Sequence, residues 1–226
     1  QENSQIIVAT HSNMIASRLN LNNVLWITEN SIKSLSNVKS DIAEFFVRAD
    51  DNAFLQLLLS KKVFLVEGAT EFLLLPMFYQ QITGHTIEED GVSVISCNGI
   101  SYKRYLEIAE ATDKKIAVVT DNDKKAHRIE EAADFNRCHA VQHIFMGATV
   151  DEWTWEACLY KENQEVLDEI VTVQKGAEYK FHGEDYGAVL GKMLNNKVDI
   201  AYQMLTADTT FEVPQYIKDA IQWLRQ

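Results

Sequence analysis

Short apolar runs alternate with longer amphipathic stretches through the middle of the chain. Four runs have the length and β-branched content of buried parallel strands: Val63–Val66, Val92–Ser96, Ile116–Thr120 and Ala140–Met146. The stretches after the first three carry apolar residues at helical spacing: Thr70–Ile82, Tyr102–Ala111 and Ala126–Ala133. Strand–helix alternation of this kind predicts an α/β fold in which helices flank a parallel sheet.

The last third of the chain has a different pattern, because apolar residues there recur mainly at helical spacing. Five stretches are predicted helices: Thr154–Tyr160, Glu165–Val171, Tyr186–Leu194, Val198–Leu205 and Tyr216–Leu224. The stretch Gln174–Gly183 has no clear period and receives no assignment. We therefore expect a mainly helical C-terminal portion beside the sheet.

The N-terminal part begins with Gln1 and opens directly onto a strand-like run, so we expect it to belong to a longer protein. Ile6–Ala9 is a predicted buried strand and Val24–Thr28 a second one. Residues 29–40 are polar and turn-rich, which is typical of a linker. The predicted organisation is residues 1–40, a connecting helix at 41–60, an α/β core at 61–160 and a helical part at 161–226.

Composition adds a core and an acidic charge to this picture. The 226 residues are 46% hydrophobic, which is enough apolar material to exclude wholesale disorder and fibrous folds. Lys and Arg number 21 against 33 Asp and Glu, a formal net charge of −12. This balance excludes a protein that coats DNA passively, because such proteins carry a basic footprint.

The cysteines and the apolar runs suggest where the protein works. Cys97, Cys138 and Cys158 are odd in number and far apart, which argues against a disulfide framework and a structural zinc site. A reducing cytoplasmic location is the simplest interpretation. Apolar runs fall well short of the ~20 residues of a membrane span, so we expect no membrane partner.

Acidic residues follow two of the predicted strands at the point where each strand ends. Glu67 ends the first strand and Glu71 lies in the first turn of the next helix, whereas Asp121 and Asp123 follow the third strand. Ligands collect at the carboxyl ends of parallel strands, and Mg²⁺ prefers carboxylate oxygens. Acids in loops are often merely solvated, but this conjunction favours a metal site. Further oxygen ligands follow the fourth strand, in the segment 151–156.

Three segments together resemble a Toprim domain, the catalytic fold shared by topoisomerases, primases and several nucleases. They are Lys62–Glu71 (KVFLVEGATE), the Asn98-Gly99 loop and Ile116–Asp123 (IAVVTDND). Upstream, Ile6–Ser12 (IIVATHS) resembles the last strand and switch-histidine loop of an ABC-type ATPase. An ATPase tail followed by Toprim is the layout of the OLD (overcoming lysogenisation defect) nucleases, which include the nuclease subunit of the Gabija anti-phage system.

Two later features are also similar to that family. Thr154-Trp155-Glu156 is similar to its Thr-Leu-Glu metal motif, with Trp in place of Leu, and Lys197 is similar to its late catalytic lysine. The resemblance implies hydrolysis of DNA phosphodiesters with one or two Mg²⁺ or Mn²⁺ ions. It implies that residues 1–40 are the end of an ATPase domain and that residues 61–160 form the Toprim core.

The resemblance also implies roles for individual residues. The implied metal ligands are Glu67, Glu71, Asp121, Asp123 and Glu156, with hydroxyl ligands from Thr120 and Thr154. The implied catalytic residues are Glu67 (also a possible general acid or base), Asp121 and Lys197. Lys197 would place a positive charge on the pentacovalent phosphate. From the residues themselves, basic side chains near the strand ends, His127-Arg128 among them, could bind phosphates around the metals. Trp153 and Trp155 could stack on DNA bases, but packing in the core is the favoured interpretation.

ATP enters only through the missing part of the expected ATPase. His11 would sense its γ-phosphate, but the chain has no G-x-x-x-x-G-K-[ST] motif and should not hydrolyse ATP by itself. Expected partners are DNA, further copies of the full-length protein and a helicase-like protein. Two alternatives stay open: a Toprim primase or topoisomerase fragment, and a non-catalytic module that binds Mg²⁺ for regulation or assembly.

Overall fold

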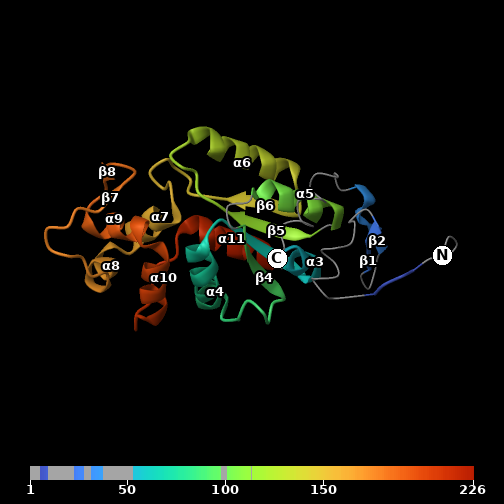
Figure 1. Ribbon diagram of the computed structural model, residues 1–226, viewed down its shortest axis with the longest axis horizontal. Coiled ribbons are helices and arrows are strands. Elements are labelled where there is room, and N and C mark those ends of the chain that lie inside the picture. The colour runs from blue at the N-terminus through green and yellow to red at the C-terminus, as the bar shows by residue number, and fades with distance from the viewer. Residues whose placement is uncertain (1–5, 10–22, 28–31, 38–52, 98–100, 113) are drawn as a thin grey trace. The chain divides into compact units, whose positions relative to one another are not determined.

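The computed structural model describes residues 6–9, 23–27, 32–37, 53–97, 101–112 and 114–226 of the chain (Figure 1). Its contacts divide the chain into two compact units. One unit is Gln1–Leu59 with Lys103–Asp113, and the other is Ser60–Tyr102 with Lys114–Gln226. The domain boundaries at residues 40, 60 and 160 remain predictions.

Among its described residues, the first unit holds a small hairpin, a short 3-10 helix and two α-helices. Strands β1 (Leu25–Ile27) and β2 (Ile32–Ser34) pair antiparallel, and the short 3-10 helix η2 (Leu35–Asn37) follows. Helices α3 (Ala53–Leu59) and α5 (Tyr102–Thr112) complete it. On α5, Tyr105, Leu106, Ile108 and Ala109 are buried, which is the i, i+3, i+4 spacing of one apolar helix face.

Two predictions for the N-terminal part are wrong. Ile6–Ala9 is irregular, and Ile6 and Ile7 are 80% and 86% exposed, because a strand needs a neighbouring backbone and none of the described residues pairs with this run. The expected linker includes β2 and the buried Leu35. Polar composition did not prevent pairing there, since a short antiparallel strand needs a single neighbour. His11 lies outside the described residues.

The second unit is built on a parallel sheet with the strand order β4-β3-β5-β6. The strands are β3 (Lys62–Val66), β4 (Val92–Ser96), β5 (Lys115–Val119) and β6 (Gln142–Phe145). Val66 pairs with both Ser96 and Val119, and Val119 pairs with Phe145. All four strands therefore end level, so the residues that follow them meet at one edge.

Helices cover both faces of this sheet (Figure 1). Helix α6 (Ala126–Cys138) packs against β6. Helix α4 (Ala69–Thr83) packs against β4, and α11 (Gln215–Arg225) packs against β5 and β6. Alternate strand residues such as Phe64, Val66 and Val119 enter the core shared with α4 and α11. The predicted α/β fold is confirmed, and α6 is five residues longer than predicted.

The C-terminal portion is mainly helical, as predicted. Its helices are α7 (Trp155–Glu162), α8 (Gln164–Ile170), α9 (Ala188–Asn195), α10 (Lys197–Thr206) and α11. The unassigned stretch contains β7 (Lys180–Phe181), which forms a hairpin with β8 (Glu184–Asp185) directly after the stretch. The hairpin turns at His182 and Gly183, whose φ angles of 49° and 84° are typical of a two-residue type I′ turn. Among the described helices, none is long and apolar enough to cross a membrane.

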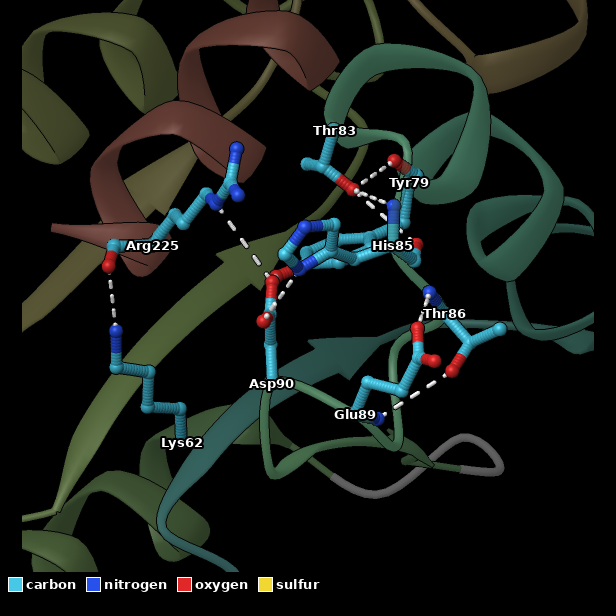
Figure 2. Close-up of polar contacts among 8 residues, drawn as sticks. All are labelled: Lys62, Tyr79, Thr83, His85, Thr86, Glu89, Asp90 and Arg225. Carbon is cyan, nitrogen blue, oxygen red and sulfur yellow. Dashed lines mark hydrogen bonds and ion pairs between the residues drawn. The ribbon is translucent and has the colours of Figure 1, made fainter.

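At the opposite edge of the sheet from the strand ends, Asp90 joins the last turn of α4 to the end of α11 (Figure 2). The Tyr79 hydroxyl donates to Asp90 Oδ2 at 2.6 Å, and His85 Nδ1 lies 3.1 Å from Oδ1. Arg225 Nε lies 3.6 Å from Oδ2. The hydrogen bonds from Tyr79 and His85 hold the pKa of Asp90 below its ordinary value of 3.8.

We expect the Tyr79→Phe protein to melt about 2–4 °C below wild type at pH 7, because the buried side chain loses its bond to the carboxylate. A carboxyl group with a lowered folded pKa stabilises the fold above its unfolded pKa, and this contribution disappears as the pH falls through the folded pKa. The difference between the two proteins should therefore shrink from about pH 5 to pH 3. Melting curves across this range test it, and a constant difference would contradict the role of Asp90.

Candidate active site

Four acidic residues come to the level edge of the sheet from different elements. Glu67 follows β3, and Glu71 lies in the first turn of α4. Asp121 follows β5 by two residues, and Glu156 lies in the first turn of α7. Gly68, between Glu67 and Glu71, has little space for a side chain, since a Cβ there would lie 3.1 Å from Glu71 Oε2. The level strand ends therefore bring these predicted residues together.

Three of these acids form a group that we call the inner carboxylates: Glu71 and Glu156, which are buried, and Asp121, which is partly exposed. Glu71 and Glu156 are 6% and 3% exposed. Burial, reinforced by the charges of Glu156 and Glu67, raises the pKa of Glu71 to about 7. Burial and the charges of Glu156, Glu71 and Glu67 raise the pKa of Asp121 well above its ordinary range. The inner carboxylates thus repel one another in a place with little water.

Lys197, the first residue of α10, supplies a positive charge to this group. Its Nζ lies 2.9 Å from Glu156 Oε2. Burial acts to lower the pKa of Lys197, but the charges of Glu156, Asp121 and Glu71 outweigh it and raise the pKa. One ammonium cannot balance three carboxylates, so the group retains a negative charge when all three are ionised.

Asp121 and Thr154 also organise the start of α7. Asp121 Oδ1 accepts the N–H of Trp155 at 2.9 Å, and Thr154 Oγ1 accepts the N–H of Ala157 at 3.1 Å. Both side chains thereby satisfy N–H groups that the first turn of a helix leaves free. These bonds orient α7 so that Glu156 lies near Glu71 and Asp121, and the Thr154 hydroxyl caps the helix.

The two other predicted acids, Glu67 and Asp123, form a second group that we call the outer carboxylates. Arg128 of α6 joins them, because its Nη1 donates to Asp123 Oδ2 and its Nη2 lies 3.6 Å from Glu67 Oε1. Thr120 donates its hydroxyl to Glu67 Oε1 and accepts from Arg128 Nη2 at 3.3 Å. The Asp-x-Asp pair is therefore divided, with Asp121 facing inward and Asp123 facing Arg128.

Asn122, between these two aspartates, holds the site together. It is fully buried, and its Nδ2 lies 3.1, 2.9 and 3.0 Å from the carbonyl oxygens of Gly147, Thr149 and Glu152. Its Oδ1 accepts the N–H of Lys124 at 2.9 Å. These bonds connect the loop after β5 to the loop between β6 and α7. Asn122 thereby fixes the position of Asp121 relative to Glu156.

The donor set of the site suits a hard divalent cation. All the converging side chains offer oxygen, as Mg²⁺ and Mn²⁺ prefer, and the inner carboxylates lack a full counter-charge. Among the residues that the structure describes, however, no three acidic, histidine or cysteine side chains are arranged around one point. The chemical types of these side chains therefore suit a divalent metal ion, but the described side chains do not form a complete ligand shell around one point.

Sequence reasoning missed two parts of this arrangement. Arg128 stood among several basic residues, and its spacing of five from Asp123 was the available signal. Asn122 is the middle residue of Asp-x-Asp, and because Asn is common in solvated turns its identity gives no signal of this role. The predicted Asn98-Gly99 loop lies outside the described residues.

Comparison with known proteins relates this geometry to one family. The family "Overcoming lysogenization defect protein-like, TOPRIM domain" matches residues 58–123. The C-terminal region of the Burkholderia pseudomallei OLD protein has a similar fold, with a TM-score of 0.51 and 14% identity over 74% of this chain and 97% of that one. The C-terminal region of the Xanthomonas campestris pv. campestris OLD protein gives 0.49 and 16%, over 75% and 94%. No curated protein matches the chain.

The matched segment covers part of the site. It includes Glu67, Glu71, Asp121 and Asp123, and it ends before Glu156 and Lys197. The last two residues join the site through the tertiary structure alone, by their contact with each other and by their charges beside Asp121.

Proposed function

We propose that the chain is the catalytic part of a metal-dependent DNA endonuclease, because residues 58–123 match the OLD-like TOPRIM family, whose domain is a nuclease-type metal-binding module. One observation carries the proposal: Glu71, Asp121, Glu156 and Lys197 lie at the carboxyl edge of the parallel sheet, close enough for their charges to shift one another's pKa. Catalytic groups in α/β sheets lie at this edge, and strongly raised carboxyl pKa values are typical of functional sites.

Glu71, Asp121 and Glu156 would hold Mg²⁺ or Mn²⁺, with Glu67 and Asp123 as further ligands. A bound ion supplies charge stabilisation and an activated water for in-line attack on the phosphodiester. Lys197 stands beside Glu156, where its ammonium would stabilise negative charge on the reacting phosphate. Glu67, which is 40% exposed and bonded to Thr120, is placed to accept or donate a proton.

Other aspects of the proposal rest on the family resemblance. They are coupling to an ATPase domain through His11, action within a homo-oligomer of the full-length protein, a helicase-like partner, a cytoplasmic location and a role in anti-phage defence. The DNA substrate is part of the same proposal, and neither fold nor charge alone selects it.

A second candidate is a non-catalytic module that binds Mg²⁺. One observation favours it: Arg128 occupies the outer carboxylates, so Asp123 and Glu67 are already paired with a cation. Such a module would gain stability from Mg²⁺ without cutting DNA.

Incubation of the chain with supercoiled plasmid tests these functions. We expect nicked or linear product with Mg²⁺ or Mn²⁺ and intact plasmid with EDTA, because cleavage needs the ion at the inner carboxylates. Relaxed closed circles would indicate a topoisomerase. A higher Tm in Mg²⁺ with no cleavage would support the binding module and contradict the proposed nuclease.

A further inference from the structure

Three aromatic rings and one lysine gather beside the loop that follows β5. The ring centroid of Trp153 lies 5.2 Å from that of Tyr186 and 6.1 Å from that of Phe181. Lys124 Nζ lies 4.8 Å from the ring centroid of Trp153 and 4.7 Å from that of Tyr186. We call these four residues the aromatic patch.

The patch differs from the core aromatics in its access to solvent. Phe78 and Trp155 are 0% and 1% exposed, whereas Trp153, Phe181 and Tyr186 are half-buried. The prediction that both tryptophans belong to the core therefore holds for Trp155 and not for Trp153. These half-buried rings are therefore partly accessible to a ligand, unlike the rings of the core.

The β7–β8 hairpin presents two of the rings. A two-stranded hairpin of this length is marginal by itself. Lys124 joins it to the loop after β5, because its Nζ lies 3.1 Å from Glu184 Oε2 and donates to the Tyr186 hydroxyl at 2.6 Å. Asn195 of α9 also donates to the Lys180 carbonyl at 3.1 Å. An ion pair and a hydrogen bond from Lys124 thus hold the hairpin against the loop, and α9 adds a further bond.

Backbone bonds connect the patch directly to the inner carboxylates. The N–H of Asp123 donates to the Trp153 carbonyl at 3.1 Å. Two residues further on, the N–H of Trp155 donates to Asp121 Oδ1. Lys124 follows Asp123 immediately and shares its left-handed backbone, with φ angles of 59° and 52°. A ligand on the patch would therefore lie next to the proposed site of cleavage.

We propose that the aromatic patch binds an unpaired nucleotide of the DNA strand that enters the active site. Accessible aromatic rings combined with a basic residue are how proteins hold single-stranded DNA without reading its sequence, since a base stacks on a ring and a phosphate meets the cation. Bases inside a duplex have no free face to stack. This inference rests on the proposed function and adds to it a preference for gaps, flaps and frayed ends.

In the structure, the carboxylate of Glu184 occupies the position beside Lys124 that the phosphate would take. Glu184, which is 63% exposed, pairs with Lys124 in the structure. An incoming phosphate would take over Lys124 and leave Glu184 in solvent. Glu184 is therefore a competitor for the ligand, and its removal should strengthen binding.

Binding of a fluorescent single-stranded oligonucleotide, measured by anisotropy at low salt, tests the proposal. Ca²⁺ replaces Mg²⁺ in the assay, since it also takes carboxylate oxygens. We expect the Phe181→Ala/Tyr186→Ala protein to bind at least about tenfold more weakly, because base stacking on an aromatic ring is worth that much or more. Tyr186→Phe, which keeps the ring, should bind as wild type does.

Two further variants distinguish a specific loss of binding from a loss caused by unfolding of the variant. Tyr202→Ala removes an aromatic side chain that is 65% exposed on α10 and should leave binding unchanged. Glu184→Gln should tighten binding by about two- to fivefold at low salt, a gain that unfolding cannot mimic. A matched duplex should bind more weakly than the single strand and should respond little to the alanine substitutions.

The outcomes separate this inference from the proposed nuclease. Strong binding that depends on Phe181 and Tyr186, in a chain that cuts no plasmid, would support the patch and contradict the nuclease. Cleavage of plasmid by a chain whose alanine variant binds oligonucleotide as tightly as wild type would overturn the patch. Equal affinity for duplex and single strand would overturn it as well.

Discussion

Asp121→Asn should reduce metal-dependent cleavage of plasmid DNA by at least about 100-fold, because the substitution removes one of the charges that would hold the ion. The two side chains have the same shape, and the Asn oxygen can still accept the N–H of Trp155. The start of α7 should therefore keep its position. Loss of activity would then report the missing charge rather than a displaced helix.

The same variant should be more stable than wild type in EDTA at pH 7.5. Burial and the charges of Glu156, Glu71 and Glu67 oppose ionisation of Asp121, so a neutral side chain relieves that repulsion. Plasmid cleavage rates and melting temperatures in EDTA measure the two effects. Asp134→Asn is a matched control, since this carboxylate is 69% exposed on α6, and it should change neither.

Full cleavage by the Asp121→Asn protein would remove this residue from the proposed site. An inactive variant with a lower Tm in EDTA would show that the main role of Asp121 is to stabilise the fold. The combination of lost activity and raised stability is the result that a functional site predicts, because such sites hold charges that the fold alone would not favour.

Asn122→Ala should destabilise the protein by about 2–4 kcal/mol, because several buried carbonyl groups and one N–H lose a partner. The chain is tight at this point, since a Cβ on Gly147 would lie 2.1 Å from the Glu152 carbonyl oxygen. The loop cannot close over the missing amide without a shift. We therefore also expect cleavage to fall at least about tenfold, as Asp121 and Glu156 lose their relative position.

Asn163→Ala is the matched control for this second effect. Asn163 is 5% exposed, donates to the Leu159 and Glu212 carbonyls and accepts the N–H of Glu212, all away from the carboxylates. It should lose a similar stability in urea unfolding and keep its cleavage rate well below its Tm. Equal loss of activity in both variants would reduce the role of Asn122 to stability alone.

Much of the fold could be predicted because its elements are encoded locally. The apolar run of β3 and the helical spacing of α4 each occupy one continuous stretch, and their boundaries lie within two residues of the prediction. The failures have a physical cause as well. Ile6–Ala9 has strand composition, but pairing is a property of two segments, whereas the β7–β8 hairpin lacks apolar alternation and depends on a turn and on contacts with α9 and Lys124.

The sequence by itself determined that acidic residues follow β3 and β5, and parallel pairing then required those strand ends to meet at one edge. Only the tertiary structure decided how the charges divide. It placed Asp121 beside the buried Glu71 and Glu156 and near Lys197, and it turned Asp123 toward Arg128. It also made Asn122 the bond between two loops and left Trp153 at the surface beside the hairpin. The direction of a side chain and the extent to which it is shielded from water depend on partners tens of residues away in the sequence. Local periodicity therefore cannot predict them.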